Sequence, residues 1–139
     1  MKVRCNGTSL SDAQQAELGT DRRFNPKYDV KVGKSYLVLA LSFIRNSPYF
    51  GSSAIVQIVN ESQECQIMPV SLFEIIDPSV SKYWKARSMG NGELKLWPQE
   101  FYADFFHDDL SECKPATVQV FERVVKRLES EAESIADKF

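Results

Sequence analysis

The stretch SYLVLALSFI, residues 35–44, decides the fold because it is the most continuously apolar part of the chain. It is rich in Tyr, Leu, Val, Phe and Ile, and it lacks the polar stripe of a surface helix. Such a run predicts a central β-strand that is covered on both faces. It is far shorter than the roughly 20 apolar residues of a membrane-spanning helix, so we expect no membrane partner.

Short strand signals follow this stretch at close intervals and alternate with turn residues. Runs rich in β-branched, aromatic and other apolar side chains predict strands at 54–59, 65–68, 71–76, 80–87 and 93–97. The Asp-Pro-Ser sequence at 77–79 suits a turn, and Asn91-Gly92 tolerates the positive φ angles of a tight hairpin. Short strands joined by local turns predict a curled antiparallel β-sheet or small barrel.

Two short helices are predicted, one before and one after the sheet in sequence. Ser9 or Ser11 can cap a helix over 12–18, and Gly19 is well placed to end it. A second helix is predicted near 98–107 and begins with Pro98. Proline suits the first position of a helix because the N–H that it lacks would have no partner there. The spacing of its aromatic residues predicts a buried side formed by Phe101, Tyr102 and Phe105.

A long amphipathic helix is predicted from Thr117 to the end of the chain. Its apolar positions lie three or four residues apart throughout: Val118, Phe121, Val125, Leu128, Ala132, Ile135 and Phe139. Such a stripe packs either on the chain's own sheet or on a second copy in a homodimer, and the sequence leaves both open. We therefore expect an α+β fold in one domain over 1–139, with a sheet core at about 30–97 and a helical part at 98–139.

Composition and charge are typical of an ordinary soluble globular protein. Hydrophobic residues make up 43% and charged residues 26% of the 139-residue chain. The net charge of −2 divides into +4 over 1–50 and −6 over 51–113, without the basic stripe that a nucleic-acid-binding protein carries. Scattered cysteines and an N-terminus without an apolar signal segment favour free thiols and a cytoplasmic location.

The stretch WPQEFYADFFHDDLSE, residues 97–112, is the main candidate for a binding surface. It contains the only histidine and five acidic residues, but no lysine or arginine. Like charges on one face add their fields and steer a basic partner toward it. Aromatic rings are favoured anchors in protein interfaces, so the Tyr83-Trp84 pair, which follows the Asp-Pro-Ser turn, is also predicted to bind the partner. The predicted partner-binding residues are Glu100, Asp104, His107, Asp108, Asp109, Glu112, Tyr83 and Trp84.

Two alternative functions stay open: a dimeric interaction or scaffold module that uses the C-terminal helix, and an enzyme or metal-binding protein centred on His107. On a helix, Asp104 and Asp108 share a face, and His107 lies one turn from Asp104. A single histidine without a second ligand motif nevertheless predicts neither a metal nor a cofactor. The sequence lacks the glycine loops, serine elbow and zinc motifs of common enzymes, and carboxylates near Cys113 oppose a thiolate. We therefore expect a binding protein without catalytic residues.

Three stretches resemble small bacterial immunity-type proteins, which accompany toxins in contact-dependent or polymorphic toxin systems. They are YDVKVGKSYLVLAL (28–41), MPVSLFEIIDPSVSKYW (68–84) and LWPQEFYADFFHDDLSE (96–112). The resemblance implies a stoichiometric inhibitor that binds its cognate toxin in the cytoplasm and carries out no turnover. Against a nuclease toxin, the acidic residues of the third stretch can mimic substrate phosphates, because complementary charge raises encounter rates.

Overall fold

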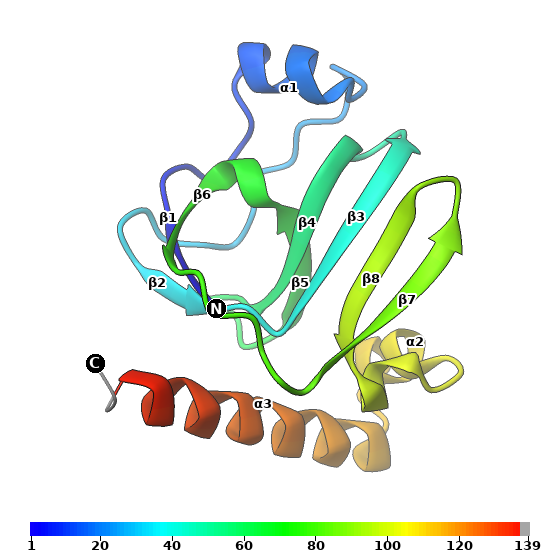
Figure 1. Cartoon of the computed structure of the whole chain (residues 1–139). Helices are drawn as coiled ribbons and strands as arrows, with labels where there is room; N and C mark the ends of the chain where they lie inside the picture. Colours follow the sequence, from blue (N-terminus) through cyan, green and yellow to red (C-terminus); the bar gives the residue numbers. More distant parts are fainter. Residues whose placement is uncertain (137–139) are drawn as a thin grey trace.

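The computed structural model describes residues 1–136, which form two antiparallel sheets and a set of helices (Figure 1). The strands are β1 (Lys2–Cys5), β2 (Ser35–Leu37), β3 (Ala40–Ser47), β4 (Gly51–Val59), β5 (Cys65–Pro69), β6 (Phe73–Asp77), β7 (Trp84–Gly90) and β8 (Glu93–Pro98). The helices are α1 (Asp12–Leu18), α2 (Phe106–Ser111) and α3 (Pro115–Ala136), with 3₁₀ turns η1 (Val70–Leu72) and η2 (Gln99–Tyr102). One sheet has the order β2-β1-β6 and the other β5-β4-β3-β8-β7, which confirms the α+β class.

Residues 35–44 form a corner between the two sheets. The single strand predicted there is wrong: β2 ends at Leu37 in the three-stranded sheet, and β3 begins at Ala40 in the five-stranded sheet. Val38 and Leu39 lie between them, each 1% exposed, and they belong to two separate hydrophobic cores. An apolar run that is covered on both sides carries no signal of where the chain changes sheet.

Two hydrogen bonds hold this corner in place. The indole N–H of Trp84 donates to the carbonyl of Leu39 at 2.9 Å. The N–H of Leu39 donates to the carbonyl of Gln57 in β4 at 2.8 Å. Both backbone polar groups of the buried residue Leu39 are therefore paired, which matters because an unpaired buried carbonyl costs about 1–3 kcal/mol.

The five-stranded sheet has a hydrophobic core on each of its faces. The core between the two sheets includes Val3, Tyr36, Val56, Ile58, Met68 and Leu72. The core on the helix side consists of Leu39, Ala40, Phe101, Phe106, Phe121, Val124 and Leu128. In Figure 1, α3 runs along one end of the molecule and α1 lies at the opposite end. Alternation along the strands sends neighbouring side chains to opposite cores.

The apolar stripe of α3 packs on the chain's own sheet. Phe121, Leu128 and Ala132 are buried, together with Val124, which the stripe prediction omits. Val118, Val125 and Ile135 of the predicted stripe are only half-buried, so the chain's own sheet covers the apolar side of the helix in part. Phe139, the last residue of the predicted stripe, lies outside the described residues.

Local signals located the first helix and the last hairpin correctly. Ser11 caps α1 through a capping box, and Gly19 ends it with φ 74°. Asn91 and Gly92 have φ 54° and 79° in the turn between β7 and β8. The strands on either side of the Asp-Pro-Ser turn, β6 and β7, belong to different sheets, and β1 has no counterpart among the predicted strands.

The helix expected near 98–107 is divided into η2 and α2. Phe105 lies between the two elements with φ 61° and is 73% exposed, so the prediction that it is buried is wrong. A left-handed backbone at a bulky residue interrupts a right-handed helix, because L-residues disfavour that conformation. Phe101 is 1% exposed, as predicted.

We predict that Trp84→Phe lowers the free energy of unfolding by about 1–3 kcal/mol, because the Leu39 carbonyl then remains buried without its donor. Chemical denaturation measures the change. Tyr83→Phe is the matched control, since it removes only a hydroxyl from the half-buried neighbouring ring, and it is expected to change stability by less than about 0.5 kcal/mol. Equal losses in the two variants would contradict the role of the corner hydrogen bond.

Candidate partner-binding groove

Three of the predicted acidic residues are engaged in ion pairs within the chain. Glu100 accepts two hydrogen bonds from Arg127 of α3, at 2.7 and 3.0 Å, and these bonds lower the pKa of its carboxyl group. Lys114 binds Asp109 at 2.9 Å and Glu112 at 3.5 Å. Their negative charge is therefore partly neutralised, and the predicted acidic surface is smaller than the sequence indicates.

Asp104 and Asp108 remain as the exposed acidic residues of this surface. Neither forms an ion pair with another residue among 1–136. They are close in sequence to Phe105, whose ring is 73% exposed. The surface at the start of α2 thus combines two solvated carboxylates with an exposed aromatic ring.

His107 is directed away from this surface and toward the sheet. Its Nε2 atom lies 2.8 Å from Oε1 of Gln57 in β4. The rings of Trp97, Phe101 and Phe106 surround the imidazole, with centroids 4.9, 5.5 and 5.4 Å away. Burial lowers the pKa of His107, so the ring is neutral near pH 7. A neutral imidazole bonded to an amide lacks the orienting carboxylate of a typical catalytic histidine.

The Tyr83-Trp84 pair does not form the exposed anchor that the sequence predicts. Trp84 is 7% exposed and lies in the core between the sheets, so it is not available to a partner. Tyr83 is half-buried, and its ring is covered by Arg127 at 4.6 Å and by Lys82 at 5.2 Å from the centroid. Tertiary packing, which the local sequence does not encode, accounts for both positions.

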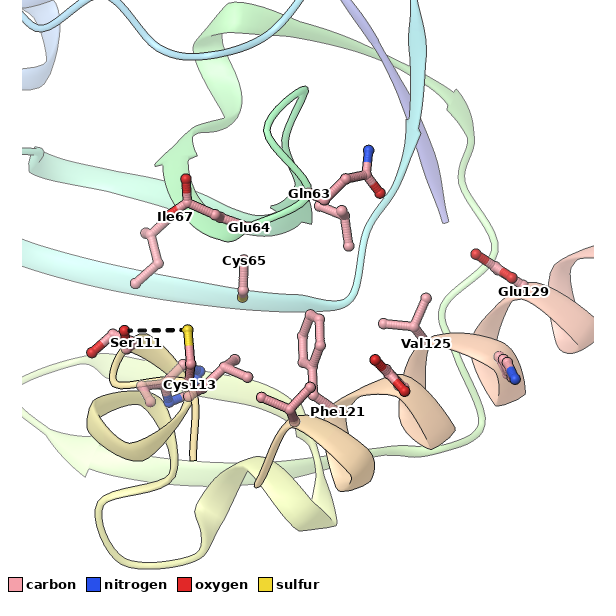
Figure 2. A pocket seen from close by; sticks show the side chains of 15 residues that line it. Gln63, Glu64, Cys65, Ile67, Ser111, Cys113, Phe121, Val125 and Glu129 are labelled. Carbon is pink, nitrogen blue, oxygen red and sulfur yellow. Dashed lines mark hydrogen bonds between the residues drawn. The ribbon is translucent and has the colours of Figure 1, made fainter. Parts of the chain in front are cut away.

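A groove of about 670 Å³ lies between the edge strand β5 and the helices α2 and α3 (Figure 2). The sheet side of the groove is formed by Val59, Gln63, Glu64, Cys65 and Ile67. The helix side includes Leu110, Ser111, Cys113, Val118, Phe121 and Val125. Figure 2 shows the side chains of Cys65 and Phe121 pointing into the groove from opposite sides. Of the predicted partner-binding residues, only His107 lines it.

The groove exists because the helices leave the helix-side face of β5 partly uncovered. The side chain of Gln57 faces the helices, since it contacts His107 of α2. Ile67 is paired with Gln57 across the sheet, and Cys65 is paired with Val59, so both side chains share that face. Ile67 is 36% exposed, which makes it an apolar side chain open to a ligand. The sequence does not reveal this face, because an edge strand has no distinctive local pattern.

The groove has an acidic rim and an uncharged interior. Glu64, Glu122 and Glu129 lie along it, together with one cation, Lys126. Burial raises the pKa of Cys65 to about 12, so its thiol is protonated near pH 7 and contributes apolar surface. Residues 1–136 contain no group of three or more His, Cys, Asp or Glu side chains placed to hold a metal ion. The groove therefore suits an apolar segment flanked by basic residues.

None of the protein-family models, curated proteins or solved structures compared with this chain matches it. Within 1–136, no helix combines the length and the apolar character needed to cross a bilayer. The functional argument consequently rests on the geometry of the groove and on the charges around it.

We predict that the stability of the fold decreases as the pH falls below 6.5, because the unfolded chain binds a proton at His107 more readily than the folded protein does. The loss is at most about 1.4 kcal/mol per pH unit from one group. Denaturation curves between pH 7 and about pH 5, where most carboxylates stay ionised, measure it. His107→Gln keeps a donor for Gln57 but does not titrate. An unchanged pH dependence in this variant would contradict the assignment.

Proposed function

We propose that the chain is a non-catalytic immunity-type protein that binds a cognate bacterial toxin in the cytoplasm and inhibits it stoichiometrically. The groove between β5 and the helices α2 and α3 is the observation that carries this proposal. Its apolar lining can bury an apolar segment of a partner, and its acidic rim complements basic residues on either side of that segment. The resemblance of 28–41, 68–84 and 96–112 to immunity-type proteins supplies the partner class.

The exposed carboxylates of Asp104 and Asp108 have a separate role in this proposal. They do not line the groove, but their negative field adds to that of its acidic rim, so a toxin with a basic surface is attracted before any close contact forms. Enzymes that act on nucleic acids carry such basic surfaces because their substrates are polyanions. A nuclease toxin therefore fits the negative charge of this surface.

We predict that Val125→Arg abolishes protection against the cognate toxin domain, which a pull-down from the native host would identify. The long charged side chain would occupy the groove, and binding is expected to weaken by at least about tenfold, equivalent to about 1.4 kcal/mol. Growth of cells that co-express the toxin domain measures protection, and calorimetry measures binding.

Val80→Arg is the matched control for this experiment, because Val80 is 60% exposed and does not line the groove. It should protect as well as the wild-type chain. Equal protection by Val125→Arg would show that the groove is not used. Failure of the wild-type chain to protect against the toxin would contradict the proposed function itself.

We also predict that the double variant Asp104→Lys/Asp108→Lys slows association with the toxin domain and reduces its salt dependence. Exposed charges act mainly on the encounter rate, whereas contacts in the groove act mainly on dissociation. Surface plasmon resonance at several salt concentrations separates the two rate constants. A changed dissociation rate with an unchanged association rate would contradict the steering role.

A further inference from the structure

The outer edge of β5 presents backbone groups that no strand pairs. In an antiparallel ladder, the N–H and C=O of one residue point toward the same neighbouring strand. The Gln57 carbonyl accepts a hydrogen bond from the N–H of Leu39, so the backbone groups of Gln57 point toward β3 and not toward β5. Gln57 and its partner Ile67 in β5 therefore form a pair without hydrogen bonds between them. The N–H of Asn60 donates to the carbonyl of Glu64 at 2.8 Å, so Glu64 points toward β4. Counting along β5 from this bonded pair gives the same result: bonded and non-bonded residues alternate, and Ile67 is non-bonded.

Cys65 and Ile67 therefore direct both of their backbone groups away from β4. No backbone or side-chain hydrogen bond to these groups occurs within residues 1–136. Pro69 takes the next outward position, where the absence of an N–H breaks no bond to β4. Because proline offers no donor, the edge that another strand can use ends there. The available edge thus consists of a short segment with two donors and two acceptors.

The same two residues also place their side chains in the groove. In a sheet, residues directly opposite each other point to the same face. A strand added to β5 would therefore direct the residues opposite Cys65 and Ile67 into the groove, and the residue between them to the other face. An apolar-x-apolar pattern in the added strand matches this arrangement, because the groove interior is lined by Phe121, Val118 and Val125.

The charges around the groove indicate which residues should lie on either side of the apolar-x-apolar segment. Glu64 directly precedes β5, and Glu122 and Glu129 lie on the α3 side, with Lys126 as the one cation of the groove lining. We infer that the occupant is an extended segment of the partner, with an apolar-x-apolar centre and basic flanks, which adds to β5 as a further strand. This inference rests on the proposed function and assigns its binding mode. Strand addition supplies affinity through main-chain bonds and specificity through alternate side chains.

A synthetic peptide, acetyl-Lys-Lys-Val-Thr-Val-Lys-Lys-amide with a fluorescent label, tests the inference by anisotropy titration of the full chain. We expect saturable binding. N-methylation of both valine nitrogens removes the donors to β5 and should weaken binding by at least about tenfold, since each lost hydrogen bond is worth about 1 kcal/mol. The same sequence with Glu in place of Lys should bind equally weakly. No binding by the first peptide, or equal binding by the methylated one, would overturn the inference.

Ile67→Pro tests the same edge from the side of the protein. It removes an outward N–H without removing a bond between β4 and β5, whereas Ile67→Ala keeps the N–H and shortens only the side chain. The proline variant should bind the lysine peptide less tightly than the alanine variant. If the proline variant fails to fold, the methylated peptide alone decides the outcome.

The toxin-protection assay separates this inference from the proposed function. Full protection by Ile67→Pro, together with loss of protection in Val125→Arg, would leave the groove as the toxin site and would rule out strand addition. An unprotected wild-type culture would instead remove the toxin as the partner, and the peptide titration would still decide whether β5 accepts a strand.

Discussion

The hydrogen bond from the Trp84 indole to the Leu39 carbonyl is the interaction on which the rest of the structure depends. It fixes the point at which the chain leaves the three-stranded sheet and enters the five-stranded sheet. Val38 then enters the core between the sheets, and Leu39 enters the core under the helices. Because neighbouring residues supply opposite cores, a shift of one residue here would send each side chain at the start of β3 into the other core.

The groove follows from how the helices cover the five-stranded sheet. Phe101, Phe106 and Phe121 stack with centroid distances of 4.9 and 6.1 Å, and they concentrate helix-side packing near the middle of the sheet. The ion pair between Glu100 and Arg127 joins η2 to α3 and restrains the helix in that position. The edge strand β5 is left partly uncovered, with apolar side chains, free backbone groups and an acidic rim in one place. This combination favours a binding role for the groove.

Sequence predicted the features that depend on neighbouring residues. Ser11, Gly19 and Asn91-Gly92 determine the backbone locally, so the first helix and the last hairpin are found where expected. Features that join distant segments were not predictable. Glu100 meets Arg127 across 27 residues, and His107 meets Gln57 across 50. Only Asp104 and Asp108 of the acidic stretch therefore stay exposed without an ion pair among the described residues. Local charge counts do not reveal such partners.

Hydrogen exchange of individual backbone amides tests the central claim, that a partner occupies the groove along β5, most directly. In the free chain, the outward amides of Cys65 and Ile67 should exchange faster than the paired amides of Gln66 and Met68. In a stoichiometric complex with the toxin domain, the account predicts that the Cys65 and Ile67 amides become protected. A complex in which these two amides exchange as fast as in the free chain would contradict it.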